Sequence, residues 1–337
     1  MALDYAFFPL AERFQDAVQP KPEYSTLYAF GDSLSDAGNV FTATSTPGSP
    51  VPPQPVAPYV GGQYSNGPIW IEDLSGQLGL GTLIPSLAGG TDYAFGGATT
   101  GYPATKSLPS LVPTLTQQVG LFLSAVGPSI PSSALYSIWI GSNDVFNIIG
   151  NGASGATASQ QVRGAAQTEA TAIAILATAG AKDFLVPLVP DLGHTPTLTA
   201  LGTAASAAGT ALSLAYDVAL EADLAGLAST PGIDLSFLDT VSLLDTAVAD
   251  PAAFGFTNVT DPCYVGPYTG GGTVCATPGQ YLFWDQLHPT AAGQALIARA
   301  EFDEVPEPAA LTVFATGLAG IVALRRRPKN RLLPDVR

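Results

Sequence analysis

Ser33 stands in surroundings that would suit a catalytic nucleophile. It belongs to the run Gly31-Asp32-Ser33-Leu34, which directly follows a short apolar segment. A serine just past a strand lies where a tight turn can expose its hydroxyl and aim backbone N–H groups at a bound oxygen. The alternative is a helix cap, because serine and aspartate are both favoured at helix N-termini. Taken alone, this run supports both interpretations.

His288 lies three residues after Asp285, in the run Trp284-Asp285-Gln286-Leu287-His288-Pro289-Thr290. That spacing lets the Asp285 carboxylate reach the imidazole Nδ1–H and hold the tautomer in which Nε2 faces a nucleophile. The alternative is an aspartate–histidine pair that only caps the following helix. The other histidine, His194, stands three residues after Asp191. Local spacing alone does not decide which of the two pairs is catalytic.

Two further runs could hold the oxyanion that forms when a nucleophile attacks an ester carbonyl. Gly96 and Gly97 follow an apolar segment, and glycines let the backbone approach closely and turn an N–H inwards. Asn143 follows another apolar segment, where its side-chain NH₂ could point at the same oxygen. Both runs also have structural interpretations, Gly-Gly as a turn and Asn-Asp as a helix start.

These runs sit among short apolar segments that alternate with alanine-rich stretches. We expect strands at residues 26–30, 93–95, 135–140, 184–188 and 233–238, and helices at 69–78, 159–178, 198–228 (with or without a break) and 291–301. Apolar strands separated by helices are typical of a parallel sheet covered on both faces, with its ligand at the carboxyl ends of the strands. The proline-rich stretch 47–58 is predicted to be an ordered surface loop near that edge.

Composition limits the class of protein and its partners. With 47% hydrophobic and 12% charged residues, the chain is neither disordered nor a coiled coil nor collagen. The net charge is −15, and six of the twelve basic residues follow position 324, so the rest of the chain is strongly acidic. An acidic body argues against nucleic acid or an anionic membrane surface as the main partner. Two histidines and two cysteines leave almost no material for a His/Cys zinc site, and we expect no metal.

Together, the four runs resemble the blocks of the GDSL, or SGNH, family of esterases and lipases. That family has a Gly-Asp-Ser-Leu block, a glycine block, a Gly-x-Asn-Asp block and an Asp-x-x-His block in this chain order. The blocks stand here at 31–34, 96–97, 141–144 and 285–288. The resemblance implies a three-layer α/β/α, flavodoxin-like fold with a parallel sheet of about five strands. Ser33 lacks a Gly-x-Ser-x-Gly elbow, which argues against an ordinary α/β-hydrolase.

The resemblance also implies roles for three residues. Ser33 would be the nucleophile, His288 the general base and then acid, and Asp285 the residue that orients His288. The implied activity is ester hydrolysis through an acyl-enzyme, on a small-molecule, lipid or sugar ester and without a cofactor. His194 would be a rim residue at most, because the family places its catalytic histidine near the C-terminal end of the domain.

The implied oxyanion hole consists of the Ser33 N–H, the Asn143 side chain and a backbone N–H from Gly96 or Gly97, with Gly97 favoured. Acyl transfer to an alcohol would use the same acyl-enzyme, so the sequence does not separate a transferase from a hydrolase. A noncatalytic surface protein that binds polysaccharide is the alternative from another class. Acyl length, alcohol part and oligomeric state stay open.

The end of the chain resembles a PEP-CTERM sorting signal of Gram-negative bacteria. Pro306-Glu307-Pro308 precedes an apolar run at 309–324 and three arginines. This signal implies export, membrane contact through the tail and a sorting enzyme that reads Pro306-Glu307-Pro308. A buried C-terminal helix is the alternative. We divide the chain into an N-terminal extension at 1–24, a hydrolase domain at 25–303 and a sorting tail at 304–337. The first twenty residues lack the pattern of a secretory signal peptide, so the expected periplasmic, cell-surface or extracellular location depends on the tail.

Cys263 and Cys275 are the two cysteines and lie in a glycine-rich stretch. In a cytosolic chain they would be free thiols, whereas in an exported chain they would close a surface loop and add about 2 to 4 kcal/mol of stability. Because the tail indicates export, we favour the disulfide.

Overall fold

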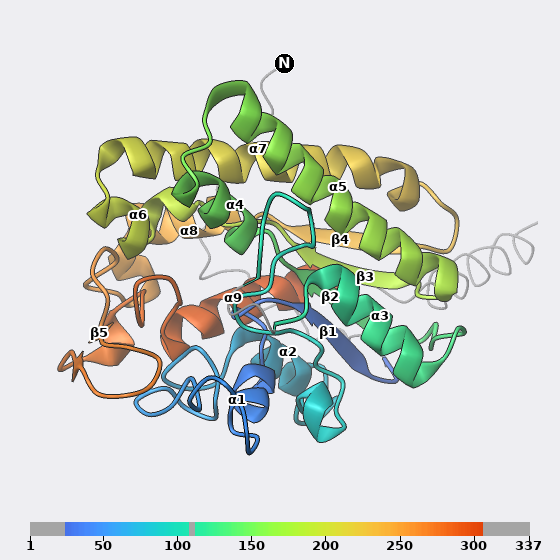
Figure 1. Cartoon of the computed structure of the whole chain (residues 1–337), viewed down its shortest axis with the longest axis horizontal. Helices are drawn as coiled ribbons and strands as arrows, with labels where there is room; N and C mark the ends of the chain where they lie inside the picture. The colour runs from blue at the N-terminus through green and yellow to red at the C-terminus, as the bar shows by residue number, and fades with distance from the viewer. Residues whose placement is uncertain (1–23, 108–111, 306–337) are drawn as a thin grey trace, which may run out of the picture.

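The computed structural model describes residues 24–107 and 112–305, which are arranged around one parallel sheet (Figure 1). The strands are, in spatial order, β1 (Leu27–Gly31), β2 (Leu135–Trp139), β3 (Asp183–Pro187) and β4 (Asp234–Leu238). Leu27 lies opposite Leu135, and Asp183 lies opposite Asp234. β2 and β3 are buried along their whole length, as parallel strands covered on both faces must be.

Helices cover both faces of the sheet, which confirms the predicted three-layer arrangement. Because strand side chains alternate between the faces, Phe30 and Ile138 enter the larger core while Leu27 and Leu135 enter the smaller one. The helices that line the larger core are α3 (Leu115–Val126), α4 (Ser142–Gly150), α5 (Gly155–Ala179) and α7 (Thr203–Ala228). The smaller core lies under α2 (Trp70–Gln77) and α9 (Ala291–Glu304), on the opposite face in Figure 1.

The predicted strand at 93–95 is not a strand of the sheet, which has four strands rather than about five. The segment nevertheless lies beside β1, and Asp92, which directly precedes it, forms an isolated bridge with Ala29. The Tyr93 N–H donates to the Ala29 carbonyl at 2.7 Å, and the Phe95 N–H donates to the Gly31 carbonyl at 3.1 Å. The ladder ends there because the chain turns at Gly97, whose φ is +83°. An edge segment therefore occupies the place of the fifth strand.

The other predicted elements match the structure closely, and the long helix predicted at 198–228 is broken. It divides into α6 (Pro196–Ala200) and α7, with Gly202 at the break. Four helices were not predicted: α1 (Asn39–Thr44), α3, α4 and α8 (Thr240–Ala249). Side chains cap several helix starts: the Asp239 carboxylate accepts from the Ser242 N–H at 2.9 Å, and Thr290 caps α9. Short 3₁₀ helices are η2 (Ser86–Ala88), η3 (Leu192–His194), η4 (Pro251–Phe254) and η5 (Pro278–Gln280).

Two loops named in the sequence analysis pack against each other. The proline-rich stretch 47–58 has no helix or strand, and its Val56 N–H donates to the Tyr268 carbonyl at 2.9 Å. Tyr268 belongs to the loop closed by a disulfide between Cys263 and Cys275, which confirms the predicted pairing. The same loop contains the hairpin of β5 (Tyr264–Val265) and β6 (Thr273–Val274).

The ends of the chain were assigned to an N-terminal extension and a sorting tail. Residues 1–23 and 306–337, including the apolar run at 309–324, lie outside the described residues. Among the residues that the structure describes, no helix has both the length and the apolar character needed to cross a membrane.

Candidate active site

The structure brings Ser33, His288 and Asp285 together at the carboxyl edge of the sheet. Ser33 lies two residues beyond the end of β1, and His288 lies just before α9. The Ser33 Oγ and the His288 Nε2 are 2.7 Å apart. On the other side of the ring, Nδ1 lies 2.9 Å and 2.8 Å from the two Asp285 carboxylate oxygens. An imidazole whose Nδ1–H is held by a carboxylate presents Nε2 as the acceptor of the serine proton.

Asp285 is almost fully buried, yet the structure keeps its carboxylate ionised. Burial raises the pKa of Asp285, but the attraction of His288 and three hydrogen bonds outweigh burial and lower the pKa below its usual value. The hydrogen bonds come from the His288 ring and from the N–H groups of Leu287 and His288, each 2.8 Å from Oδ1. A carboxylate that is charged at neutral pH can stabilise the imidazolium that forms when His288 accepts a proton.

Two tyrosines to which the sequence assigns no role support this pair. The buried Tyr59 hydroxyl donates to the Asp285 Oδ2 at 2.7 Å. The Tyr64 ring lies 5.0 Å from the His288 ring, centre to centre, and a Cβ on Gly96 would fall within 2.5 Å of the Tyr64 ring. Gly96 is therefore glycine because the tyrosine that packs on the catalytic histidine occupies the space of its side chain.

The predicted oxyanion donors differ in their availability. The Gly96 N–H donates to the Asp36 Oδ2 at 2.8 Å and is therefore already engaged. Among the described residues, no hydrogen bond uses the N–H of Gly97 or of Ser33. Gly97 has a left-handed φ of +83°, which an L side chain would adopt only with strain.

Asn143 is held in place by the residue before Ser33. Its Nδ2 donates to the Ala98 carbonyl at 2.9 Å and to the Asp32 Oδ2 at 3.2 Å. Asn143 lies in the first turn of α4, so the run is also a helix start, which was the alternative interpretation of its sequence. Burial raises the pKa of Asp32 to about 7, against the lowering effects of the Leu34 N–H and His288.

The turn after Ser33 is organised by Asp36. Its carboxylate accepts hydrogen bonds from the N–H groups of Gly38, Asn39, Val40 and Gly96. Burial raises the pKa of Asp36 to about 6, although these hydrogen bonds favour the charged form. Because one carboxylate joins the serine turn to the glycine turn, the two segments are held at a fixed distance.

An apolar pocket opens directly beside Ser33 and His288. Its walls come from three helices, with Phe146 of α4, Leu243 and Ala247 of α8, and Leu296 of α9. Most of its lining residues are apolar, and Ser33 and His288 are among the polar ones, which suits a ligand with one reactive polar group and an apolar chain.

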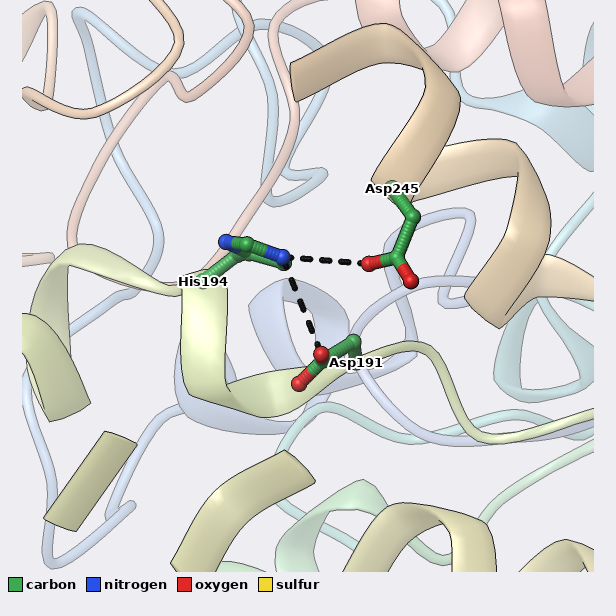
Figure 2. Close-up of side chains that lie close together, drawn as sticks. All are labelled: Asp191, His194 and Asp245. Carbon is green, nitrogen blue, oxygen red and sulfur yellow. Dashed lines mark hydrogen bonds and ion pairs between the residues drawn. The ribbon is translucent and has the colours of Figure 1, made fainter. Parts of the chain in front are cut away.

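His194 lies apart from Ser33, in η3. Its neighbours Leu192 and Thr195 line the apolar pocket, whereas His194 faces Asp191 and Asp245 (Figure 2). These three side chains form a group of His and carboxylate donors close enough to hold a metal ion. Local spacing pairs His194 with Asp191 only, because Asp245 is remote in sequence.

The chain belongs to the family of GDSL-like lipases and acylhydrolases, whose model matches residues 27–301. Residues 304–327 match the PEP-CTERM protein-sorting motif, which indicates export in a Gram-negative bacterium. These two matches confirm both resemblances inferred from the sequence.

Several curated proteins are similar to this chain. The phosphatidylcholine-sterol acyltransferase of Aeromonas hydrophila is 26% identical over 89% of this chain and 85% of its own length. The acetylesterase of Thermothelomyces thermophilus is 27% identical over 82% of this chain and 87% of its own length. Esterase EstA of Pseudomonas aeruginosa is 31% identical over 87% of this chain and 48% of its own length. The chain thus spans about half the length of some relatives and most of the length of others.

Proposed function

We propose that this protein hydrolyses carboxylic esters through a covalent acyl-enzyme on Ser33. The observation that carries the proposal is the unbroken chain of hydrogen bonds from Ser33 through His288 to Asp285. Membership of the GDSL-like lipase and acylhydrolase family supports the same reaction.

The first half of the reaction forms the acyl-enzyme. Ser33 Oγ attacks the ester carbonyl carbon while His288 Nε2 takes the serine proton, and the carbonyl π electrons move onto the oxygen. The ionised Asp285 stabilises the resulting imidazolium. When the tetrahedral intermediate collapses, the bond to the alcohol oxygen breaks and His288 returns its proton to that oxygen.

The second half releases the acid. Water attacks the acyl carbonyl as His288 Nε2 removes its proton, and collapse of this second intermediate returns the proton to Ser33 Oγ. Atoms and charges balance over the cycle, which consumes one water and yields one alcohol and one acid.

The oxyanion of both intermediates is held, in this proposal, by the N–H groups of Ser33 and Gly97 and by Asn143. Their availability supports the first two, because neither N–H has a partner among the described residues. Asn143 must exchange its hydrogen bond to Asp32 or to Ala98 for one to the oxyanion. Each such donor typically contributes about 10²- to 10³-fold to kcat.

The apolar pocket is the proposed site of the acyl chain. It begins at Ser33 and continues between α8 and α9 along leucine, phenylalanine and isoleucine side chains. Burial of apolar chain atoms would contribute roughly 25 cal/mol per Å² of surface removed from water. One relative is named an acyltransferase, but none of the described residues that line this site favours an alcohol acceptor over water.

We further propose that the hydrolase domain at 25–303 is exported and retained in the periplasm or at the cell surface through the tail at 304–337. The separate matches of the two segments support this division. The proposed partner of the tail is the sorting enzyme of a PEP-CTERM system, acting at Pro306-Glu307-Pro308.

The test is the turnover of short p-nitrophenyl esters by Ser33→Ala. We expect kcat to fall by at least about 10⁴-fold, because loss of the nucleophile removes the acyl-enzyme route. Circular dichroism and thermal melting of the variant should match those of the unchanged protein, since Ser33 packs no core. Turnover that survives in a folded Ser33→Ala protein would refute the proposal.

A further inference from the structure

Asp191, His194 and Asp245 converge on one point although they come from different elements (Figure 2). Asp191 and His194 belong to the segment of η3, and Asp245 projects from α8. His194 Nε2 lies 3.0 Å from the Asp245 Oδ1 and 3.7 Å from the Asp191 Oδ2. Figure 2 shows this ring nitrogen facing both carboxylates, while the other ring nitrogen points away.

The protein itself supplies too few protons for these acceptors. Nε2 can donate one hydrogen bond at most, and Asp245 is the nearer carboxylate. Asp191 is 3% exposed, and its Oδ2 is otherwise approached only by the Thr210 hydroxyl, 3.0 Å away. The single proton of that hydroxyl is shared with Oδ1, which lies closer at 2.7 Å. The buried Oδ2 of Asp191 therefore faces the imidazole with only the longer of the two Thr210 contacts as a hydrogen bond.

No ion pair with lysine or arginine neutralises this group within residues 24–107 and 112–305. The ion pairs of that part of the chain all involve histidine. Two carboxylates in a chain with a net charge of −15 attract cations strongly.

We propose that Asp191, His194 and Asp245 bind a divalent transition-metal cation of the zinc class. One imidazole nitrogen and two carboxylate oxygens form a donor set that suits Zn²⁺. In a tetrahedral site with bonds of about 2.0 Å, ligand atoms lie roughly 3.3 Å apart. The observed separations of 3.0 and 3.7 Å fall on either side of this value, and all three ligand atoms lie within 4.8 Å of one another.

One ligand is already fixed in orientation. The Asp191 carboxylate accepts from the Gly193 N–H at 2.8 Å and from the Thr210 hydroxyl. Such supporting hydrogen bonds orient a metal ligand before the ion arrives. His194 and Asp245 are 37% and 50% exposed at their side chains, so an ion can enter from solvent and keep water as its fourth ligand.

The bound cation would join two walls of the apolar pocket. Leu192 of η3 and Leu243 of α8 line that pocket, and the three ligands lie beside them in the chain. A cation between η3 and α8 would hold these walls together and stabilise the fold by mass action. It would take no part in ester chemistry, because Ser33 reacts through His288.

Zinc titration of the full chain, prepared without a histidine tag and stripped with a chelator, tests this proposal by calorimetry. We expect one Zn²⁺ per chain and a thermal midpoint that rises with Zn²⁺. His194→Ala and Asp245→Asn should each weaken binding by at least about 10-fold. Asp223→Asn, which removes an exposed carboxylate from α7, is the matched control and should leave binding unchanged.

His288→Ala separates this site from the catalytic histidine, since the chain has only two histidines. Binding that persists in His288→Ala and disappears in His194→Ala supports the proposal. Binding that disappears in His288→Ala and persists in His194→Ala would overturn it, as would no Zn²⁺ binding by the unchanged protein at millimolar concentration. Because the readout is binding, the outcome does not depend on whether the protein hydrolyses esters.

Discussion

Tyr59 is the residue at which the chain of hydrogen bonds from Ser33 through His288 and Asp285 ends. Its hydroxyl donates to the Asp285 carboxylate from 226 positions away in the sequence. Local spacing predicts Asp285 beside His288, because three residues of chain fix that contact. No local pattern can predict Tyr59, since only the folded loop at 47–58 and its neighbours bring it to the site. Tyr64 opens the stretch 64–70, which also resembles a family segment, but only the folded structure shows that its ring packs on His288.

Replacing Tyr59 with phenylalanine should therefore lower kcat with little change in KM. The variant loses a hydrogen bond to a buried carboxylate, and we expect a reduction of roughly 10-fold. Without that hydrogen bond the pKa of Asp285 rises, so activity should begin to fall at a higher pH on acidification. Tyr102→Phe is the control, because the Tyr102 hydroxyl makes no hydrogen bond within the described part of the chain. An unchanged kcat and pH profile in Tyr59→Phe would show that the tyrosine only fills space.

Helix α8 forms one wall of the site, and the sequence analysis did not predict it. Its ten residues directly follow strand β4, and so short a segment carries only a weak helical pattern. α3 was missed for a related reason, since proline and glycine surround and interrupt it. The strands were found because buried parallel strands are continuously apolar. The segment 93–95 was predicted to be a strand because its sequence is also continuously apolar.

Ala247 tests whether the pocket beside α8 holds the acyl chain. This residue lines the pocket and is 1% exposed, so Ala247→Leu would place three extra carbons in it. We expect kcat/KM to fall roughly 10-fold or more for esters of longer acids and less than about twofold for acetate. Chain-length profiles with p-nitrophenyl esters measure this. Ala249→Leu, on the exposed side of α8, should leave the profile unchanged. Equal losses for all esters in Ala247→Leu would place the acyl chain elsewhere.

The molecule as a whole buries several carboxylates. Burial raises the pKa of Asp32 to about 7, of Asp144 to about 6 and of Asp217 to about 8. Groups whose pKa is higher in the folded than in the unfolded chain bind more protons in the folded state. They therefore favour folding at low pH, and this contribution is lost as pH rises through the folded pKa values.

The thermal midpoint should accordingly fall between about pH 5 and pH 8, by roughly 5 °C. Asp285 acts in the opposite sense, because folding lowers its pKa. Its contribution to stability is complete above the ordinary pKa of aspartate and is therefore constant between pH 5 and pH 8. Scanning calorimetry across the range measures the trend. High salt screens repulsion on the acidic surface but not the buried groups, so the trend should persist in about 0.5 M NaCl. A midpoint that rises with pH would contradict the assignment.

Labelling with a fluorophosphonate, followed by intact mass and peptide mapping, tests the activated serine most directly. Such a reagent reacts with a serine only where a base and an oxyanion site activate it. We predict a single adduct, located on Ser33, that is absent from Ser33→Ala and forms far more slowly on His288→Ala. An adduct on another residue, or none on the folded protein, would contradict the proposed acyl-enzyme mechanism.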